Sequence, residues 1–296
     1  MKVVILEALS VGEDMDFTPF DRFGEIVIYQ SSTEDEVADR VKDCDVIVAN
    51  KVPMNEKTLC KAENLKLVCL TATGINNLDG EYLKKRGIAA CNVAGYSTNG
   101  VAQHTFALMF YVMEKLSYYD QYVKSGDYAK GAVFSHFSEA FCELQDKTWG
   151  IIGMGAIGTR VAEIAATFGC KVICYSASGS KYDTPYEQVD FDELLQRSDF
   201  LSVHAPLNKY TENLMTIDAF RKMKNSAIFI NVARGAIVNE ADLYTALTEN
   251  EIAGAALDVL CKEPMDPANP LLNIKDSKKL IITPHIAWAA KETASA

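Results

Sequence analysis

The apolar positions of this 296-residue chain gather in short runs, and helical spacing prevails between the runs. Short apolar runs are typical of buried strands, and apolar residues recurring every three or four positions favour helices. In the first third, the pattern predicts strands over residues 2–7, 25–29, 45–49, 65–70 and 88–91, with helices over 33–42, 55–61 and 80–86. This alternation predicts a parallel sheet with helices on both faces.

A longer helical segment follows over residues 97–124 and is long enough to connect two domains. Residues 125–146 lose this periodicity and carry Tyr128, Phe134, Phe137 and Phe141. We interpret them either as an extended arm that contacts another subunit or as a loop packed on its own domain. The alternation then resumes. It predicts strands near 149–152, 171–175, 200–203, 227–231, 254–257 and 280–283, with helices over 191–197, 217–223 and 240–249.

Composition narrows the class of protein. The net charge of −11 and the pI of about 4.9 argue against nucleic acid as a partner, so any anion site has to be built locally. No apolar stretch is long enough to cross a membrane and no signal-peptide pattern opens the chain, so we expect a cytoplasmic protein. Eight cysteines without C-x-x-C spacing predict small core residues in a reducing compartment and no metal site.

The most informative motif is GMGAIG at residues 153–158, which fits G-x-G-x-x-G. It follows one predicted strand, opens a helical pattern and precedes a second strand. In that setting the first glycine allows a tight turn, the second lets a pyrophosphate approach, and the third lets helix and strand pack closely. The helix start offers free N–H groups to phosphates. We expect dinucleotide contacts at Gly153, Gly155, Ala156, Ile157 and Gly158; the alternative is a tight turn without a ligand.

The residue that selects the cofactor departs from the usual pattern. NAD-selective sites place Asp or Glu about 20 residues beyond the glycines, where it holds the ribose 2′-OH. This chain has Ser176 there, followed by Ser178, Ser180 and Lys181. These groups would not repel a 2′-phosphate, although no arginine is present to grip it. The sequence therefore leaves both NAD and NADP open.

Besides GMGAIG, six short motifs are spread along nearly the whole chain, at residues 74–79, 92–97, 231–235, 257–259, 263–264 and 283–288. In this order they resemble the D-isomer-specific 2-hydroxyacid dehydrogenases. His-Ile-Ala-Trp at 285–288 looks most like the glycerate dehydrogenase (hydroxypyruvate reductase) branch.

The resemblance implies an α/β protein of two doubly wound parallel-sheet domains with the active site in the cleft between them. A Rossmann cofactor domain, residues 100–284, would be inserted into a flavodoxin-like substrate domain, residues 1–99 plus 285–296. Relatives are commonly homodimers. They also run longer, so we expect the last helices of the substrate domain to lie beyond residue 296.

The resemblance also implies the chemistry of the site. Reducing a 2-keto acid needs a hydride from nicotinamide, a proton and a cation for the carboxylate. His285 would donate the proton, and Glu263 beside it would favour the imidazolium form. Arg234 would grip the carboxylate and polarise the carbonyl through its planar donor fork. We expect no catalytic role for His104, His136 or His204.

Other site residues come from the same resemblance. The turn of Thr73, Gly74 and Ile75 would complete the carboxylate site with backbone N–H groups. Trp288 would line the substrate pocket, with plain packing as the alternative. The remaining cofactor contacts would be Asp258, at the nicotinamide carboxamide, together with Ser176, His204, Pro206, Val232, Ala233 and His285.

Several functions remain open. The substrate pair we expect is hydroxypyruvate/D-glycerate or glyoxylate/glycolate. A D-lactate dehydrogenase-like reductase is one alternative. A dinucleotide-sensing, corepressor-like binding protein is another, because such proteins share the fold and keep Arg, Glu and His.

Overall fold

The computed structural model describes residues 1–12 and 15–294, which form two compact units. Among these residues, one unit comprises residues 1–97 and 289–294, and the other comprises Thr98–Trp288. The expected boundaries at residues 99 and 285 lie close to these, but His285 falls in the second unit. The reason is local, because the backbone N–H groups of Ile286 and Ala287 donate to the buried carboxylate of Asp258.

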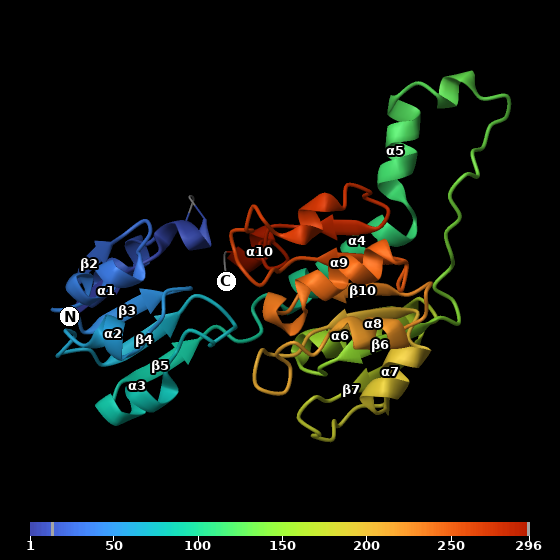
Figure 1. The fold of residues 1–296 in the computed structure, drawn as a ribbon. Coiled ribbons are helices and arrows are strands. Elements are labelled where there is room, and N and C mark those ends of the chain that lie inside the picture. Colours follow the sequence, from blue (N-terminus) through green and yellow to red (C-terminus); the bar gives the residue numbers. More distant parts are fainter. Residues whose placement is uncertain (13–14, 295–296) are drawn as a thin grey trace. The chain divides into compact units, whose positions relative to one another are not determined.

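The first unit contains a parallel five-stranded sheet with the order β2-β1-β3-β4-β5 (Figure 1). This is the flavodoxin-like strand order, as expected. The strands are β1 (Lys2–Ile5), β2 (Glu25–Ile28), β3 (Val46–Ala49), β4 (Leu67–Leu70) and β5 (Ala89–Asn92). The helices are α1 (Glu34–Arg40), α2 (Glu56–Leu59), α3 (Gly80–Arg86) and α10 (Lys291–Ala294), with 3₁₀ turns at Ala8–Val11 and Thr18–Phe23.

Local sequence explains where these helices begin and end. Thr33 and Glu36 form a capping box at the start of α1. The Asp79 side chain accepts the N–H of Tyr82 at the start of α3, and Gly87 ends that helix with φ 68°. Capping side chains satisfy N–H groups that have no partner within the helix, and glycine adopts the left-handed end conformation at little cost.

The second unit contains a parallel seven-stranded sheet with the order β12-β11-β10-β9-β6-β7-β8. The order reverses between β6 and β9, as in a Rossmann fold, and ligands of such sheets bind at that point. The strands are β6 (Thr148–Ile152), β7 (Lys171–Tyr175), β8 (Glu187–Gln188), β9 (Phe200–Val203), β10 (Ile228–Asn231), β11 (Gly254–Leu257) and β12 (Leu280–Ile282). The helices are α4 (Thr98–Met113), α5 (Leu116–Lys124), α6 (Ala156–Thr167), α7 (Phe191–Arg197), α8 (Ile217–Lys222) and α9 (Glu240–Thr248).

The long helix predicted over residues 97–124 is interrupted. Helix α4 ends at Met113, and α5 starts after Lys115, which has the left-handed φ of 56°. The following segment projects with α5 away from the sheet of its unit (Figure 1). Its Phe134 and Phe137 side chains are 90% and 85% exposed. These exposures favour the arm over a loop packed on its own domain.

The core of the second unit consists of two apolar clusters. One holds Trp149 of β6 with Phe200 of β9 and Phe106 of α4, whose ring lies 4.6 Å from that of Trp149. The other holds Phe220 and Phe229. Burying each such side chain contributes about 1.5–3 kcal/mol. This core keeps the strand ends that carry the site in fixed register.

Cysteine burial differs from the expectation. Only Cys44, Cys170 and Cys174 are buried, while the others are half-buried or exposed, and all eight are free thiols. Among the described residues, we find no helix with the length and apolar character needed to cross a membrane.

Candidate functional site

The three predicted catalytic residues follow three neighbouring strands. Arg234 comes after β10, Glu263 after β11 and His285 after β12. These strands are adjacent and parallel, so their carboxyl ends meet at one edge of the sheet. The structure thus gathers an arginine, a carboxylate and a histidine from distant parts of the sequence at the edge where such sheets bind ligands.

His285 and Glu263 form a hydrogen-bonded pair. The Nδ1 atom of His285 lies 2.7 Å from Oε2 of Glu263. The other carboxylate oxygen, Oε1, accepts the N–H of Leu260 at 2.9 Å. An ionised carboxylate only accepts hydrogen bonds, so Nδ1 carries a proton in this pair. The second ring nitrogen, Nε2, is therefore the atom that can exchange a proton with a bound molecule.

The loop that carries His285 is anchored to Asp258. Ile286 and Ala287 donate their N–H groups to the two carboxylate oxygens at 2.9 and 2.8 Å, and the Thr283 hydroxyl donates to Oδ1 at 2.6 Å. His285 itself has φ 56°, and its N–H donates to the carbonyl oxygen of Asp258. A non-glycine residue persists in this conformation only when its surroundings hold it there.

The Asp258 carboxylate is ionised although it is 1% exposed. Burial raises the pKa of this carboxyl, but the nearby His104 ring and the hydrogen bonds from Thr283 and the N–H groups of Ala287 and Ile286 outweigh burial and hold the pKa below its usual range. A depressed pKa in the folded state stabilises the protein above the unfolded pKa. That contribution is lost as the pH falls through the folded pKa. The expected contact with nicotinamide stays a prediction.

Arg234 is placed by the turn that ends β10. The Asn231 side chain accepts the N–H of Ala233 at 3.0 Å and donates to the carbonyl oxygen of Arg234 at 2.9 Å. Gly235 packs so closely that a Cβ atom there would overlap the backbone of Leu260. This contact brings the Arg234 turn against the loop that leads to Glu263, which explains why glycine follows the arginine.

The three glycines of the GMGAIG motif have distinct environments. Gly153 has φ +94°, and a Cβ there would lie 2.8 Å from the backbone of Ala205. A Cβ on Gly158 would overlap the carbonyl oxygen of Gly153. A Cβ on Gly155, by contrast, would meet no atom within 4 Å. The first and third glycines therefore serve the fold, whereas the second leaves open space at the start of α6.

The start of α6 suits an anion. Gly155 is its N-cap and supplies no capping side chain, and no acidic residue lies in the first turn. Unfilled N–H groups and the helix dipole favour a phosphate at such an end. Ala156 and Ile157, which we expected to contact the cofactor, are the first two residues of this helix. The open space at Gly155 and the uncapped helix fit the pyrophosphate of a dinucleotide.

We predict that Gly155→Ala weakens cofactor binding without changing stability. The backbone there is extended, with φ −76°, so alanine fits, but its Cβ would enter the space left for the pyrophosphate. The dissociation constant for NADH or NADPH, measured calorimetrically, should rise roughly tenfold or more, about 1.4 kcal/mol. Gly80→Ala is the matched control, since its Cβ also meets open space but in α3. Unchanged affinity in Gly155→Ala would place the pyrophosphate elsewhere.

His204 adds a buried nitrogen that needs a partner. Burial lowers the pKa of His204 to about 3, so the ring is neutral near pH 7. The Trp149 indole donates to the Ser202 hydroxyl at 2.9 Å, and that hydroxyl lies 3.0 Å from His204 Nε2. Nδ1 is buried without a hydrogen-bond partner among the described residues. His204 follows β9 beside the Gly153 turn, so a polar ligand group at this turn would supply the hydrogen-bond partner that Nδ1 lacks, whose absence costs about 1–3 kcal/mol.

The other expected cofactor residues lie at the same strand ends. Ser176 follows β7 and is 3% exposed, with its hydroxyl 3.3 Å from that of Ser178. Val232 and Ala233 are buried after β10, and Pro206 is exposed after β9. Their contacts with a cofactor stay predictions.

The expected substrate residues divide between the units. Thr73, Gly74 and Ile75 follow β4 in the first unit, where the Thr73 hydroxyl donates to the carbonyl oxygen of Val93 at 3.1 Å. Trp288 lies in the second unit and packs against the apolar cluster that contains Ala287. This packing accounts for Trp288 without a ligand, so its substrate contact stays a prediction.

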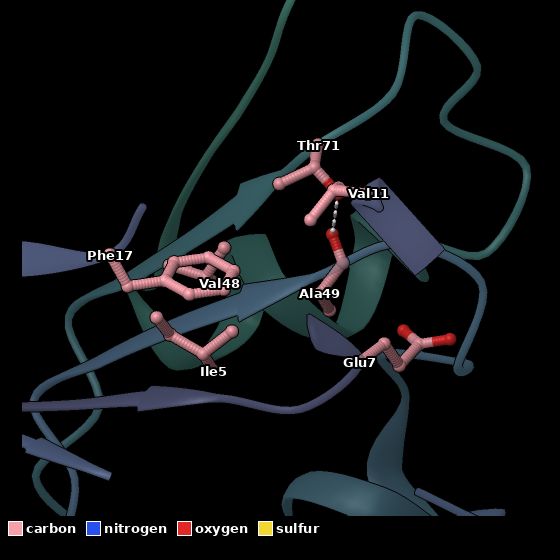
Figure 2. A pocket seen from close by; sticks show the side chains of 7 residues that line it. All are labelled: Ile5, Glu7, Val11, Phe17, Val48, Ala49 and Thr71. Atoms are coloured by element: carbon pink, nitrogen blue, oxygen red, sulfur yellow. Dashed lines mark hydrogen bonds between the residues drawn. The ribbon is translucent and has the colours of Figure 1, made fainter. Parts of the chain in front are cut away.

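The first unit also contains a small hollow (Figure 2). Ile5, Val48 and Phe17 line it together with Glu7, Val11, Ala49 and Thr71. The Glu7 carboxylate accepts the backbone N–H groups of Asn50, Lys51 and Val52. None of the expected site residues lines this hollow. The Glu7 carboxylate is already hydrogen-bonded to the loop of residues 50–52. We assign this hollow no catalytic role.

Two residues near the site were missed by sequence reasoning. Asn231 orders the Arg234 turn, and Thr283 joins Asp258 to His104. Both lie inside the motifs that carry the resemblance. A polar residue at a buried strand end is the signal that would have indicated them.

Comparison with known proteins agrees with this geometry. The family model described as "D-isomer specific 2-hydroxyacid dehydrogenase, NAD binding domain" matches residues 106–287. A hydroxypyruvate reductase of Blautia hydrogenotrophica is 34% identical over 99% of this chain and 92% of its own length. A glycerate dehydrogenase of Methylorubrum extorquens is 36% identical over 98% of this chain and 90% of its own length.

A solved acyclic imino acid reductase in complex with NADPH and D-Arg has a TM-score of 0.88 and 29% identity to this chain. The match covers 100% of this chain and 92% of that one. The strand order of the second sheet, the glycine turn before α6 and these matches all indicate the same family. This chain belongs to the family of D-isomer-specific 2-hydroxyacid dehydrogenases and is a nicotinamide-dependent oxidoreductase.

Proposed function

We propose that this protein reduces a small 2-keto acid to the D-2-hydroxy acid, with hydroxypyruvate or glyoxylate as substrate. The observation that carries the proposal is the His285–Glu263 pair, with Arg234 after the neighbouring strand at the same carboxyl edge of the sheet. The names of the hydroxypyruvate reductase and glycerate dehydrogenase relatives support the choice of substrate.

Each catalytic side chain has a distinct part in this proposal. Arg234 binds the carboxylate of the keto acid and hydrogen-bonds its carbonyl oxygen, which polarises the carbon for attack. When bound, the nicotinamide supplies the hydride. His285 donates the Nε2 proton to the oxygen that becomes the hydroxyl. Glu263 orients the ring by accepting the hydrogen bond from Nδ1.

The cofactor would be held by the start of α6 and by the ends of the neighbouring strands. Gly155, Ala156 and Ile157 would cradle the pyrophosphate. His204, Pro206, Val232, Ala233 and Asp258 would line the remaining length, and Ser176 would face the adenosine ribose. The Nδ1 atom of His204, which lacks a hydrogen-bond partner in the part of the chain that the structure describes, and the space at Gly155 support this placement.

Cofactor preference is predicted to depend on Ser176. We propose that the chain accepts NADPH as well as NADH, because Ser176, Ser178 and Ser180 put hydroxyls where other sites carry a carboxylate. Ser176→Asp should shift the ratio of kcat/KM toward NADH roughly tenfold or more by repelling a 2′-phosphate. Ser176→Asn is the uncharged control. A flat ratio in the aspartate variant would remove Ser176 from the ribose.

The function is tested by following cofactor oxidation at 340 nm with purified protein. NADH and NADPH are each combined with hydroxypyruvate, glyoxylate, pyruvate and 2-ketoisocaproate. We expect the highest kcat/KM with hydroxypyruvate or glyoxylate. A preference for pyruvate would favour the D-lactate dehydrogenase-like reductase instead. Absence of turnover in a folded, cofactor-binding protein would favour the corepressor-like function.

The exposed arm supports a proposal about assembly. Tyr128, Val133, Phe134, Phe137 and Phe141 are all exposed on it. We propose that a second copy of the chain covers these side chains in a homodimer, because burying apolar surface of this kind stabilises association.

The free cysteines are compatible with a reducing compartment such as the cytoplasm, which stays a prediction.

A further inference from the structure

A hydrogen-bonded chain links helix α4 to the loop that carries His285. The Nε2 atom of His104, on α4, lies 3.0 Å from the Thr283 hydroxyl oxygen. That hydroxyl lies 2.6 Å from Oδ1 of Asp258. His104 Nε2 is also 3.6 Å from the same carboxylate oxygen. The side chains of His104 on α4, Asp258 after β11 and Thr283 after β12 therefore lie together next to the loop that carries His285.

The direction of these hydrogen bonds follows from the acceptor at the end of the chain. An ionised Asp258 can only accept, so the Thr283 hydroxyl donates its single proton to Oδ1. The Thr283 oxygen can then only accept from His104, which requires a proton on His104 Nε2. Thr283 has one other acceptor in range, the carbonyl oxygen of Leu257, but at 3.5 Å it is far longer than the bond to Asp258.

The chain bears on His285 because Asp258 also accepts the N–H groups of the two residues after it. His285 has φ 56°, so its neighbours must hold its backbone. Without the Thr283 donor, the Asp258 carboxylate is free to rotate about its Cβ–Cγ bond, and its hold on Ile286 and Ala287 then weakens. A shift of about 1 Å in a catalytic group can cost roughly 100-fold in rate.

We propose that His104 and Thr283 are positioning residues that act on His285 through Asp258. Neither touches the reacting atoms. His104 donates to Thr283, Thr283 donates to Asp258, and Asp258 holds the loop in the conformation that aims His285 Nε2. This inference rests on the proposed role of His285.

Paired substitutions test the chain at each link. Thr283→Val keeps the shape and removes the hydroxyl, while Thr283→Ser restores it. His104→Leu removes the donor, while His104→Gln can donate from its amide. We expect Thr283→Val and His104→Leu to lower kcat roughly 10- to 100-fold with cofactor affinity within about twofold of the wild type. The serine and glutamine variants should recover most of the rate, and the double variant should be no worse than the poorer single one.

A second readout is independent of turnover. Amide hydrogen exchange at Ile286 and Ala287, measured on the cofactor-free protein, should be faster in Thr283→Val and His104→Leu and near the wild-type rate in the conservative variants. Wild-type exchange and wild-type kcat in Thr283→Val would overturn the inference. Equal losses in His104→Leu and His104→Gln would overturn it as well. A wild-type protein without turnover would instead contradict the proposed function, while the exchange data would still decide whether the chain holds the loop.

Discussion

Replacing His285 should lower kcat roughly 10²–10⁴-fold, the loss typical of removing a general acid. His285→Asn is the variant that best suits the backbone conformation at this position. Residue 285 has φ 56°, a conformation that asparagine adopts more readily than alanine does. Asparagine can also donate to Glu263, as Nδ1 of His285 does now at 2.7 Å. The variant thus keeps the loop and removes the transferable proton.

The measurement is kcat with saturating keto acid and cofactor, together with cofactor affinity and thermal stability. Cofactor affinity should stay within a few-fold of the wild type, because the asparagine substitution leaves the glycine turn and α6 unchanged. His285→Ala should lose a similar amount of kcat and some stability as well. Turnover by His285→Asn within threefold of the wild type would contradict the role of His285 as the proton donor.

Replacing Arg234 with alanine should lower kcat/KM for the keto acid roughly 10²–10⁴-fold. Two hydrogen bonds from a charged group, each contributing about 1.5–3 kcal/mol, account for this range. The backbone of Arg234 is extended, with φ −145°, so alanine introduces no strain. The effect should appear both as a higher KM and as a lower kcat, because in the proposed function the guanidinium both binds the carboxylate and polarises the carbonyl.

One further variant separates the shape of the guanidinium from its charge, and another serves as a control. Arg234→Lys keeps the charge and lacks the planar fork, so its kcat/KM should lie between those of the wild type and Arg234→Ala. Arg221→Ala is the matched control, since Arg221 forms surface ion pairs with Glu249 and Glu251 on the same unit. A loss in Arg234→Ala no larger than that in Arg221→Ala would remove Arg234 from the substrate site.

The fold could be predicted where the signal is local. Apolar runs placed most strands within a few residues, and GMGAIG located the start of α6. The interruption at Lys115 could not be predicted, because apolar residues continue on both sides of it. The short strand β8 (Glu187–Gln188) was missed because two polar residues carry no strand pattern. The interruption at Lys115 and the strand β8 both depend on contacts with residues that are distant in the sequence.

The candidate site shows the same division. The identities of Arg234, Glu263 and His285 came from motifs, but the orientation of His285 depends on Asp258 and on a helix far away in the sequence. Thr283 and His104 are separated by 179 positions, and no periodicity connects them. Asp258 was expected to contact the cofactor. The structure shows its carboxylate holding the loop that carries His285, a role that only the folded chain could indicate.

The most direct test of the account is to identify the product formed from hydroxypyruvate and to determine its configuration. The wild-type protein, supplied with NADH or NADPH, should convert hydroxypyruvate to D-glycerate, and chiral chromatography should detect no L-glycerate. His285→Asn, assayed at the same concentration, should form roughly 10²–10⁴-fold less product. Formation of L-glycerate, or equal product from the variant, would contradict the assignment of this site as a D-specific reductase that protonates its substrate through His285.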